Sequence, residues 1–397
     1  MVNKVIPIER AHAKLSASGS EKWMTCTPSA RLEEQFPDEG SEFAREGTFA
    51  HELFELAMLV ATEQIDAGKA KARFAEIRSN PLWSQDLEDH VRAASDFTRE
   101  RIDAAKARCK DPVFMVEQRL DFSEWVPEGF GTGDFVIITD GLIEVLDLKY
   151  GKGIRVDAEN NSQMRLYGLG AYNELSMLYN ITDVRMTVLQ PRLDNYPTET
   201  LTIAELLDWA VTKVVPAAKL AWEGEGLFVP GDHCNSCFCK ARFQCKARGD
   251  ASLALAKEEF ALVQPELLSE DQVRAVLEKG DQLAKWISDV QSYALEQAEK
   301  QGKNWPGFKL VEGRSNRKYS DQKAVAAALL AAKVPESVIY ERSLLGITAM
   351  EKAIGKKVFA EVLNEFIVKP SGKPTLVPEG DKRPALASAA TAVEDFS

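Results

Sequence analysis

Hydrophobic residues follow two different periods along most of the chain. Some stretches repeat apolar residues at helical spacing, and others are short runs rich in β-branched and aromatic residues, as in strands. In chain order, the pattern predicts helices over 41–66 and 84–109, strands over 113–120, 134–139 and 142–149, a helix near 161–179, a strand over 183–191 and a helix over 203–221. Helix, three strands, helix and strand is the order of a compact α/β unit. We therefore expect one central sheet flanked by helices.

The C-terminal third of the chain changes character. Residues 268–302 show a long amphipathic pattern, which Ser269 and Gln272 could begin with a capping box. Two or three short helices are expected within 321–366, and the segment from about Lys369 is rich in Pro, Gly, Ser and Ala, which predicts a mobile tail. We expect a domain over 1–250, a mostly helical domain over 251–368 and a flexible tail over 369–397.

Composition and charge limit the possible functions. Of the 397 residues, 45% are hydrophobic and 28% are charged, as in ordinary soluble globular proteins. No stretch approaches the roughly 20 apolar residues that span a bilayer, and the N-terminus lacks the apolar core of a signal peptide, so we expect a cytosolic protein. The formal net charge of −12 argues against a broadly basic nucleic-acid binder, but it allows a local basic track beside a carboxylate metal site.

The most informative stretch is GTGDFVIITDGLIEVLDLKYGKG, residues 131–153. Asp140 and Gly141 lie between two β-rich runs, which predicts a hairpin with a two-residue turn. In that register Asp134 faces Asp147, with their Cβ atoms roughly 5 Å apart. Lys149 lies two residues beyond Asp147 and so points to the same face of the sheet.

Two facing carboxylates destabilise a hairpin unless something neutralises them. A divalent cation would do so, because hard cations such as Mg²⁺ bind one or two carboxylates together with water and substrate phosphate. An ammonium group at Lys149 could stabilise charge on a scissile phosphate or orient the attacking water. The alternative is a solvent-exposed hairpin with ordinary surface charges, although runs that are apolar on both faces favour a covered sheet.

Three motifs resemble those of RecB-like nucleases of the PD-(D/E)XK superfamily. Gly131-Thr132-Gly133-Asp134, followed by Asp147-Leu148-Lys149, resembles the Gly-x-x-Asp and Asp-x-Lys elements. Gln163 and Tyr167, four residues apart on the next helix, resemble the Q-x-x-x-Y element, whose alternative is a helix face packing on the sheet. Upstream, Gly47-Thr48-Phe49-Ala50-His51 resembles the G-x-x-x-H element, although a lone His on an amphipathic helix is usually structural.

The resemblance implies an αβββαβ nuclease core and a role for each matched residue. His51, Asp134 and Asp147 would hold one or two Mg²⁺ or Mn²⁺ ions, with the main-chain carbonyl of Leu148 as an extra ligand. Lys149 would act on the nucleophile or the transition state. Gln163 and Tyr167 would position DNA.

The cysteines extend the resemblance. The chain has six: Cys26, Cys109, Cys234, Cys237, Cys239 and Cys245. In a reducing compartment such a cluster indicates a metal site rather than disulfides. RecB-like nucleases of the AddB kind hold a 4Fe–4S cluster with one cysteine before the core and three after it, usually spaced C-x₂-C-x₅-C.

Here Cys26 precedes the core, and four cysteines after it compete for three places. Cys239 and Cys245 fit the second gap of that spacing, while Cys234 and Cys237 fit the first. Cys26, Cys245 and Cys234 are our first choices, and the choice between Cys237 and Cys239 stays open. Zn²⁺ is the chemical alternative, because four thiolates also suit a tetrahedral zinc site.

The whole chain also resembles a family of phage and prophage proteins of this size. The resemblance rests on the segments AHAKLS (11–16), GRSNR (313–317), LLGIT (344–348) and KPTLVPEGDKRP (373–384). It implies a role in DNA recombination, replication or repair in a bacterial cytosol. In the C-terminal domain, a basic and aromatic group could contact single-stranded DNA or be an ordinary solvated loop: Trp305, Arg314, Arg317 and Lys318.

We therefore expect metal-dependent hydrolysis of DNA. Exonuclease action on DNA ends is favoured, because no separate base-reading module is visible. A single-strand annealing or single-strand binding protein is a conceivable partner. Two other hypotheses stay open: a non-catalytic DNA-binding accessory protein in recombination, and a zinc-stabilised scaffold that binds other proteins.

Overall fold

The computed structural model describes residues 13–36, 42–151, 153–259, 270–311, 321–340, 345–363 and 366–367. By its contacts the chain forms two compact units, residues 1–296 and 297–397. The first unit therefore reaches beyond residue 250, where the sequence suggested a domain border.

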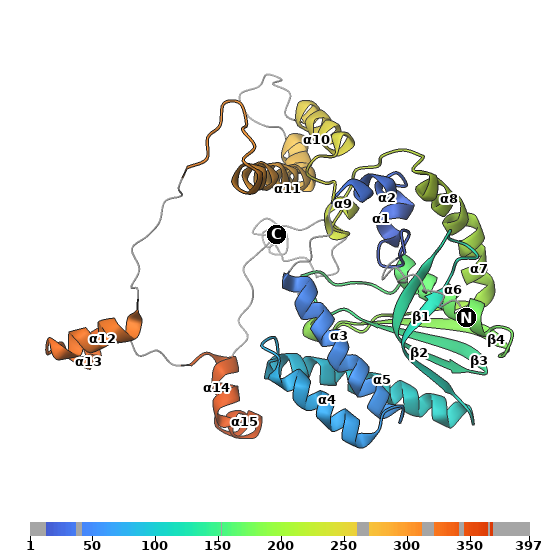
Figure 1. Cartoon of the computed structure of the whole chain (residues 1–397), viewed down its shortest axis with the longest axis horizontal. Coiled ribbons are helices and arrows are strands. Elements are labelled where there is room, and N and C mark those ends of the chain that lie inside the picture. The colour runs from blue at the N-terminus through green and yellow to red at the C-terminus, as the bar shows by residue number, and fades with distance from the viewer. Residues whose placement is uncertain are drawn as a thin grey trace, which may run out of the picture. The chain divides into compact units, whose positions relative to one another are not determined.

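A mixed five-stranded sheet forms the centre of the first unit (Figure 1). Its order is β1-β2-β3-β4-β5, and only the pair β3–β4 is parallel. The strands are β1 (Val113–Asp121), β2 (Phe130–Thr139), β3 (Gly141–Leu148), β4 (Ile181–Leu189) and β5 (Thr198–Thr202). The expected α/β class with a helix-flanked mixed sheet is confirmed.

Helices cover both faces of the sheet. On one face lie α3 (Glu42–Ala61), α4 (Ala67–Ser79) and α5 (Gln85–Arg108). On the other lie α1 (Ser20–Thr25), α6 (Ser162–Leu175), α7 (Ile203–Trp209) and α8 (Val215–Glu223), with the short α2 (Ser29–Leu32) beside α8. A five-residue π-helix, Ala210–Val214, joins α7 to α8 just before Pro216, whose missing N–H interrupts the regular helical ladder.

Each face of the sheet has its own hydrophobic core. Phe135, Ile137, Leu146 and Leu148 pack under α3, α4 and α5. The intervening residues pack under α6 and its neighbours: Val136, Ile138, Ile143 and Val145. Both faces being covered explains why β2 and β3 are nearly continuous apolar runs rather than alternating ones.

The remaining described α-helices are α9 (His233–Ser236), α10 (Lys246–Glu259), α11 (Glu270–Gln301), α12 (Gln322–Ala331), α13 (Glu336–Ile339), α14 (Ile347–Ile354) and α15 (Lys356–Leu363). This fits the expected helical character of the C-terminal part. Ser269, the side chain of Gln272 and the tail over 369–397 lie outside the described residues. Among the described helices, none combines the length and apolar character that crossing a membrane requires.

Candidate functional site

The β2–β3 hairpin has the register that the sequence predicts. Its paired residues run from Thr139 opposite Leu142 to Phe135 opposite Leu146. Gly141, with φ +85°, supplies the positive φ of the turn. One further step of this register brings Asp134 opposite Asp147.

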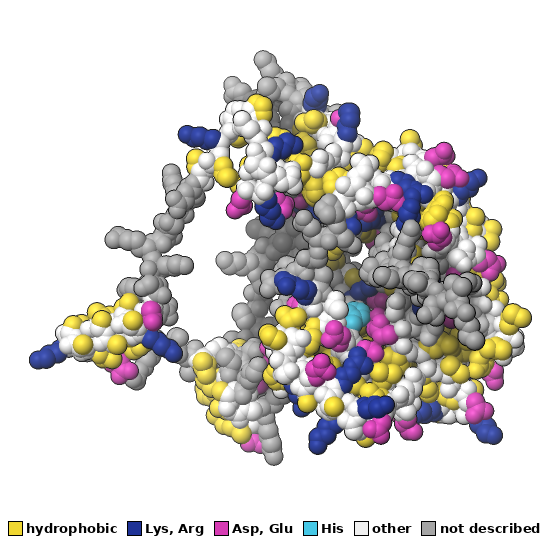
Figure 2. All heavy atoms as spheres, viewed as in Figure 1, with side chains coloured by type: hydrophobic (Ala, Val, Ile, Leu, Met, Phe, Trp, Pro, Cys, Tyr) yellow, Lys and Arg dark blue, Asp and Glu magenta, His cyan; other side chains and the backbone are white. Residues whose placement is uncertain are grey.

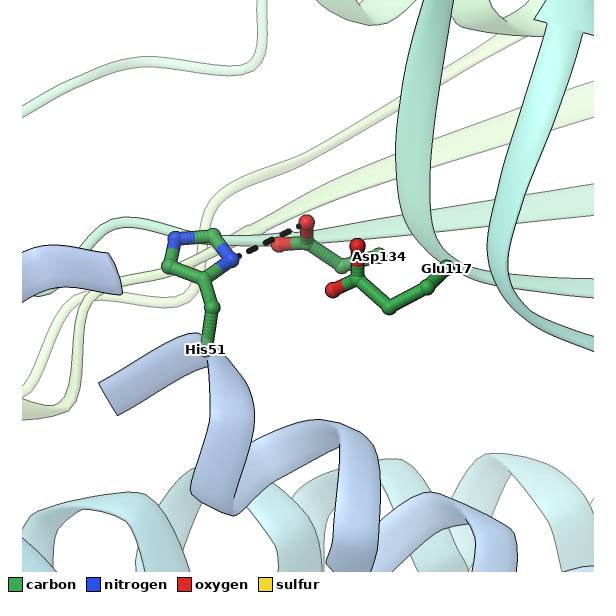
Figure 3. A group of neighbouring side chains, drawn as sticks. All are labelled: His51, Glu117 and Asp134. Carbon is green, nitrogen blue, oxygen red and sulfur yellow. Dashed lines mark hydrogen bonds and ion pairs between the residues drawn. The ribbon is translucent and has the colours of Figure 1, made fainter. Parts of the chain in front are cut away.

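Asp134 is held from two sides. It is 5% exposed. The backbone N–H of Leu148 donates to its Oδ2 at 2.6 Å, and His51 Nδ1 lies 3.1 Å from its Oδ1. His51 comes from α3, on the face of the sheet opposite α6, and its ring points toward the Asp134 carboxylate (Figure 3). Leu148 thus contacts the site through its N–H, while the ligand role expected for its carbonyl stays a prediction.

Asp147 is 2% exposed and has its own set of partners. Lys149 Nζ lies 2.8 Å from its Oδ2, in an ion pair. Gln163 Nε2 donates to Asp147 Oδ1 at 3.2 Å and to the hydroxyl of Tyr167 at 3.1 Å. The first two turns of α6 therefore reach the site through the predicted i, i+4 pair. The helix starts here because Asn161 caps it, its side chain accepting from Met164 N at 3.2 Å.

Close packing explains why positions 131 and 133, in and beside the Gly-x-x-Asp motif, are glycines. A Cβ at Gly131 would lie 2.7 Å from Cε1 of Tyr167 and 3.3 Å from the Cβ of Ala17. A Cβ at Gly133 would lie 2.8 Å from Leu120. The absent side chain at Gly131 lets the Tyr167 ring approach the strand beside Asp134.

Glu117 is a member of the site that the sequence analysis missed. Val116 pairs with Phe135 and Gln118 with Gly133, so Glu117 lies opposite Asp134 in an unshifted register. Its φ of +48° turns its side chain toward the carboxylate of Asp134 (Figure 3). The signal in the sequence was an acid inside the apolar run VFMVEQRL.

His51, Glu117 and Asp134 each offer one ligand atom, and these atoms lie within 4.8 Å of one another. Among the described residues, the buried Oε1 of Glu117 has no hydrogen-bond partner. An orphaned buried oxygen beside a second carboxylate and an imidazole is the donor set that a divalent cation prefers.

The site carries excess negative charge. Burial, reinforced by Asp134, raises the pKa of Glu117 to about 7. Burial also raises the pKa of Asp147, with Lys149 acting against it. At His51 burial disfavours the charged ring, but attraction to Asp134 outweighs it and raises the pKa to about 9. A cation bound here would offset both the repulsion and the burial of these carboxylates.

Acidic and basic side chains are interspersed over the face of the first unit in Figure 2, and histidine atoms reach the surface there. The net charge of −12 is thus not concentrated in one acidic area of this face.

Four cysteines line one small pocket: Cys26, Cys234, Cys239 and Cys245. Cys26 follows the last residue of α1, Cys234 lies in α9, and Cys245 precedes α10. Cys237 is not among the residues that line this pocket. Burial raises the pKa of the Cys239 thiol to about 12 and that of Cys237 to about 11. Of the two cysteines between which the spacing left the choice open, Cys239 therefore lies with the other three, and its role as a ligand stays a prediction.

A family model matches residues 12–384 and is described as "Protein of unknown function (DUF2800)". The chain belongs to this family. The match runs through both compact units of this DUF2800 protein and includes every residue of the site.

In the second unit of this DUF2800 chain, Lys303 Nζ lies over the ring of Trp305, 4.2 Å from its centroid. Arg314, Arg317 and Lys318 lie outside the described residues. A contact between this group and single-stranded DNA stays a prediction.

Proposed function

We propose that this protein is a metal-dependent deoxyribonuclease of the RecB-like PD-(D/E)XK type that acts on DNA ends. One observation carries the proposal: His51, Glu117 and Asp134 converge beside the Asp147–Lys149 pair. An apolar hairpin has no structural reason to bury facing carboxylates, so their presence supports a bound cation.

The residues fit Mg²⁺ or Mn²⁺. Carboxylate oxygens suit both ions, and the imidazole of His51 suits Mn²⁺ in particular. A bound ion of this kind lowers the pKa of a water ligand and stabilises charge on a phosphate. Glu117 would add a third carboxylate to the two that the motifs predict.

The other residues would position the reacting groups. Lys149 stands 2.8 Å from Asp147, so its ammonium could hold the attacking water or a phosphate oxygen at the carboxylate edge. Gln163 uses its amide N–H groups to fix both Asp147 and the Tyr167 hydroxyl. Gln163 and Tyr167 would orient the DNA strand against Asp147 and restrict its movement.

The pocket cysteines fit a 4Fe–4S cluster, with Cys26, Cys234, Cys239 and Cys245 as ligands. The cluster would join the start of the chain to the segment that follows the sheet. Its first role would be structural. Zinc is the other metal that four thiolates suit, and metal analysis separates the two.

The biological setting we propose is DNA recombination, replication or repair of a phage or prophage in the bacterial cytosol. A single-strand annealing or single-strand binding protein would be a suitable partner, because such proteins take up the strand that an exonuclease exposes.

The test is degradation of end-labelled linear single- and double-stranded DNA by protein purified without oxygen, with Mn²⁺, with Mg²⁺ and with EDTA. We expect metal-dependent loss of label that Asp147→Ala abolishes. Glu144→Gln, a change at a buried acid on the same strand but on the opposite face, should retain activity. Folded, iron-containing protein that leaves both substrates intact would refute the nuclease.

A further inference from the structure

The loop between the pocket cysteines ends helix α9 in a Schellman motif. The N–H of Cys239 donates to the carbonyl of Cys234 at 3.0 Å, and the N–H of Phe238 donates to the carbonyl of Asn235 at 3.1 Å. These two bonds are the pair that defines the motif, with Cys237 as the C-cap and Phe238 as the residue after it.

Phe238 is an unusual residue for this position. Its φ is +49°, in the left-handed region that the motif normally fills with glycine. A bulky side chain there is strained. The ring is also 76% exposed, so it adds little to any hydrophobic core. Local stability would favour glycine, and the phenyl ring therefore needs a reason outside the fold.

Charged side chains of both signs lie around the loop. Lys240 lies two residues away and is half-buried. Lys22 Nζ donates to the carbonyl of Cys237 at 3.4 Å. Glu33 lies between them, pairing with Lys22 at 2.7 Å and accepting from the backbone N–H of Lys240 at 2.6 Å.

The loop is connected to the candidate site through one short helix. Helix α1 contacts both α9 and α6. Ser20, at the start of α1 and 1% exposed, hydrogen-bonds through its hydroxyl to that of Ser162 at 2.6 Å. Ser162 directly precedes Gln163, the residue that holds Asp147.

We propose that Phe238 is a stacking platform for a nucleobase of single-stranded DNA. Every base has an aromatic face, so a single exposed ring can hold a strand without reading its sequence. The inference rests on the proposed function, since it concerns the strand that the nuclease would hold.

The experiment measures binding of fluorescein-labelled oligo(dT) by anisotropy in EDTA, so that no cleavage occurs, together with the Tm of each protein. Phe238→Gly should weaken binding about tenfold and raise the Tm by roughly 2 to 4 °C, because strain is relieved. Phe238→Trp should keep the affinity, and Phe238→Asn, which tolerates a positive φ, should lose it.

A variant that binds DNA more weakly but has a higher Tm is the result expected if the ring serves binding rather than stability. Phe238→Gly protein that binds oligo(dT) like the wild type, or that loses both affinity and Tm, overturns the inference, as does wild type without affinity for oligo(dT). Because binding is measured apart from cleavage, the two proposals can fail separately. If Phe238→Gly lowers the affinity for oligo(dT) while the wild type never cleaves DNA, the stacking platform is supported and the nuclease is refuted.

Discussion

Glu117 and Glu144 are carboxylates of the same sheet with different partners. Glu144 lies 3.4 Å from Arg185 and 3.9 Å from Arg108, so its charge is compensated within the fold. Glu117 faces Asp134, and its pKa is raised to about 7 chiefly by burial. The first acid stabilises the sheet when ionised, whereas a bound cation would compensate the charge of the second.

The two acids give a matched pair of substitutions. Glu117→Gln should weaken Mn²⁺ binding about 100-fold, because it removes a ligand oxygen. It should also raise the free energy of unfolding of the metal-free protein at alkaline pH by about 1 kcal/mol. The raised pKa means that the ionised acid costs stability increasingly as pH rises from its unfolded value to about 7. Calorimetric titration and denaturant unfolding measure the two effects.

Glu144→Gln should behave in the opposite way. It should leave Mn²⁺ affinity unchanged and lower the free energy of unfolding by about 1 to 3 kcal/mol, since Arg185 loses its buried partner. Equal loss of Mn²⁺ affinity in both variants would contradict the assignment of Glu117 to the metal site.

Metal affinity should depend on pH. Before a cation binds, His51, with a pKa of about 9, must lose a proton, and so must Glu117, with a pKa of about 7. Mn²⁺ affinity should therefore rise steadily between about pH 6 and pH 9, with protons released on binding. Titrations in buffers of different ionisation enthalpy count those protons. An affinity that is flat over this interval would exclude His51 as a ligand.

At the scale of elements, the hairpin was the part most readily predicted. The β2–β3 register followed from one turn signal, Asp140-Gly141, between two apolar runs, because a two-residue turn fixes how the strands on either side of it pair. The same register predicted that Asp134 lies opposite Asp147, and helical spacing predicted that Gln163 lies beside Tyr167.

Glu117 escaped prediction because no short turn joins β1 to β2, so the sequence did not show that it lies opposite Asp134. Its positive φ also departs from the extended conformation that strand reasoning assumes. Helix α4 and strand β5 were missed for other reasons. The sequence of α4 is rich in Ala and charged residues and lacks a broad apolar stripe. Strand β5 has five residues, four of them polar, at the edge of the sheet.

The contact between strand β2 and helix α6 can be tested at Gly131. Gly131→Ala should lower the free energy of unfolding by about 1 to 3 kcal/mol, because its Cβ would press on the Tyr167 ring 2.7 Å away. Gly153→Ala is the control, since a Cβ there meets nothing within 4 Å. Its effect should stay within about 0.5 kcal/mol of zero. Denaturant unfolding measures the free energy of unfolding of both variants. Similar values for the two would contradict the close contact between Gly131 and the Tyr167 ring.

At the scale of the whole molecule, the pocket cysteines connect segments that are far apart in sequence. Cys26 lies before the sheet and the others lie after it, so a shared cluster would close a loop that contains all five strands. Closing so long a loop restricts the unfolded chain strongly, and a metal–thiolate group has that effect only while its ligands are intact.

Cys239→Ala and Cys237→Ala test which of these two cysteines is a ligand of the cluster. Protein purified without oxygen should lose its iron and acid-labile sulfide in Cys239→Ala, and its Tm should fall by roughly 10 °C as about 4 kcal/mol of loop restriction is lost. Cys237→Ala should keep both, because Cys237 does not line the pocket. Iron retained in Cys239→Ala but lost in Cys237→Ala would reverse the assignment. Stoichiometric zinc without sulfide in the wild type would replace the cluster by a tetrahedral site with the same four cysteines.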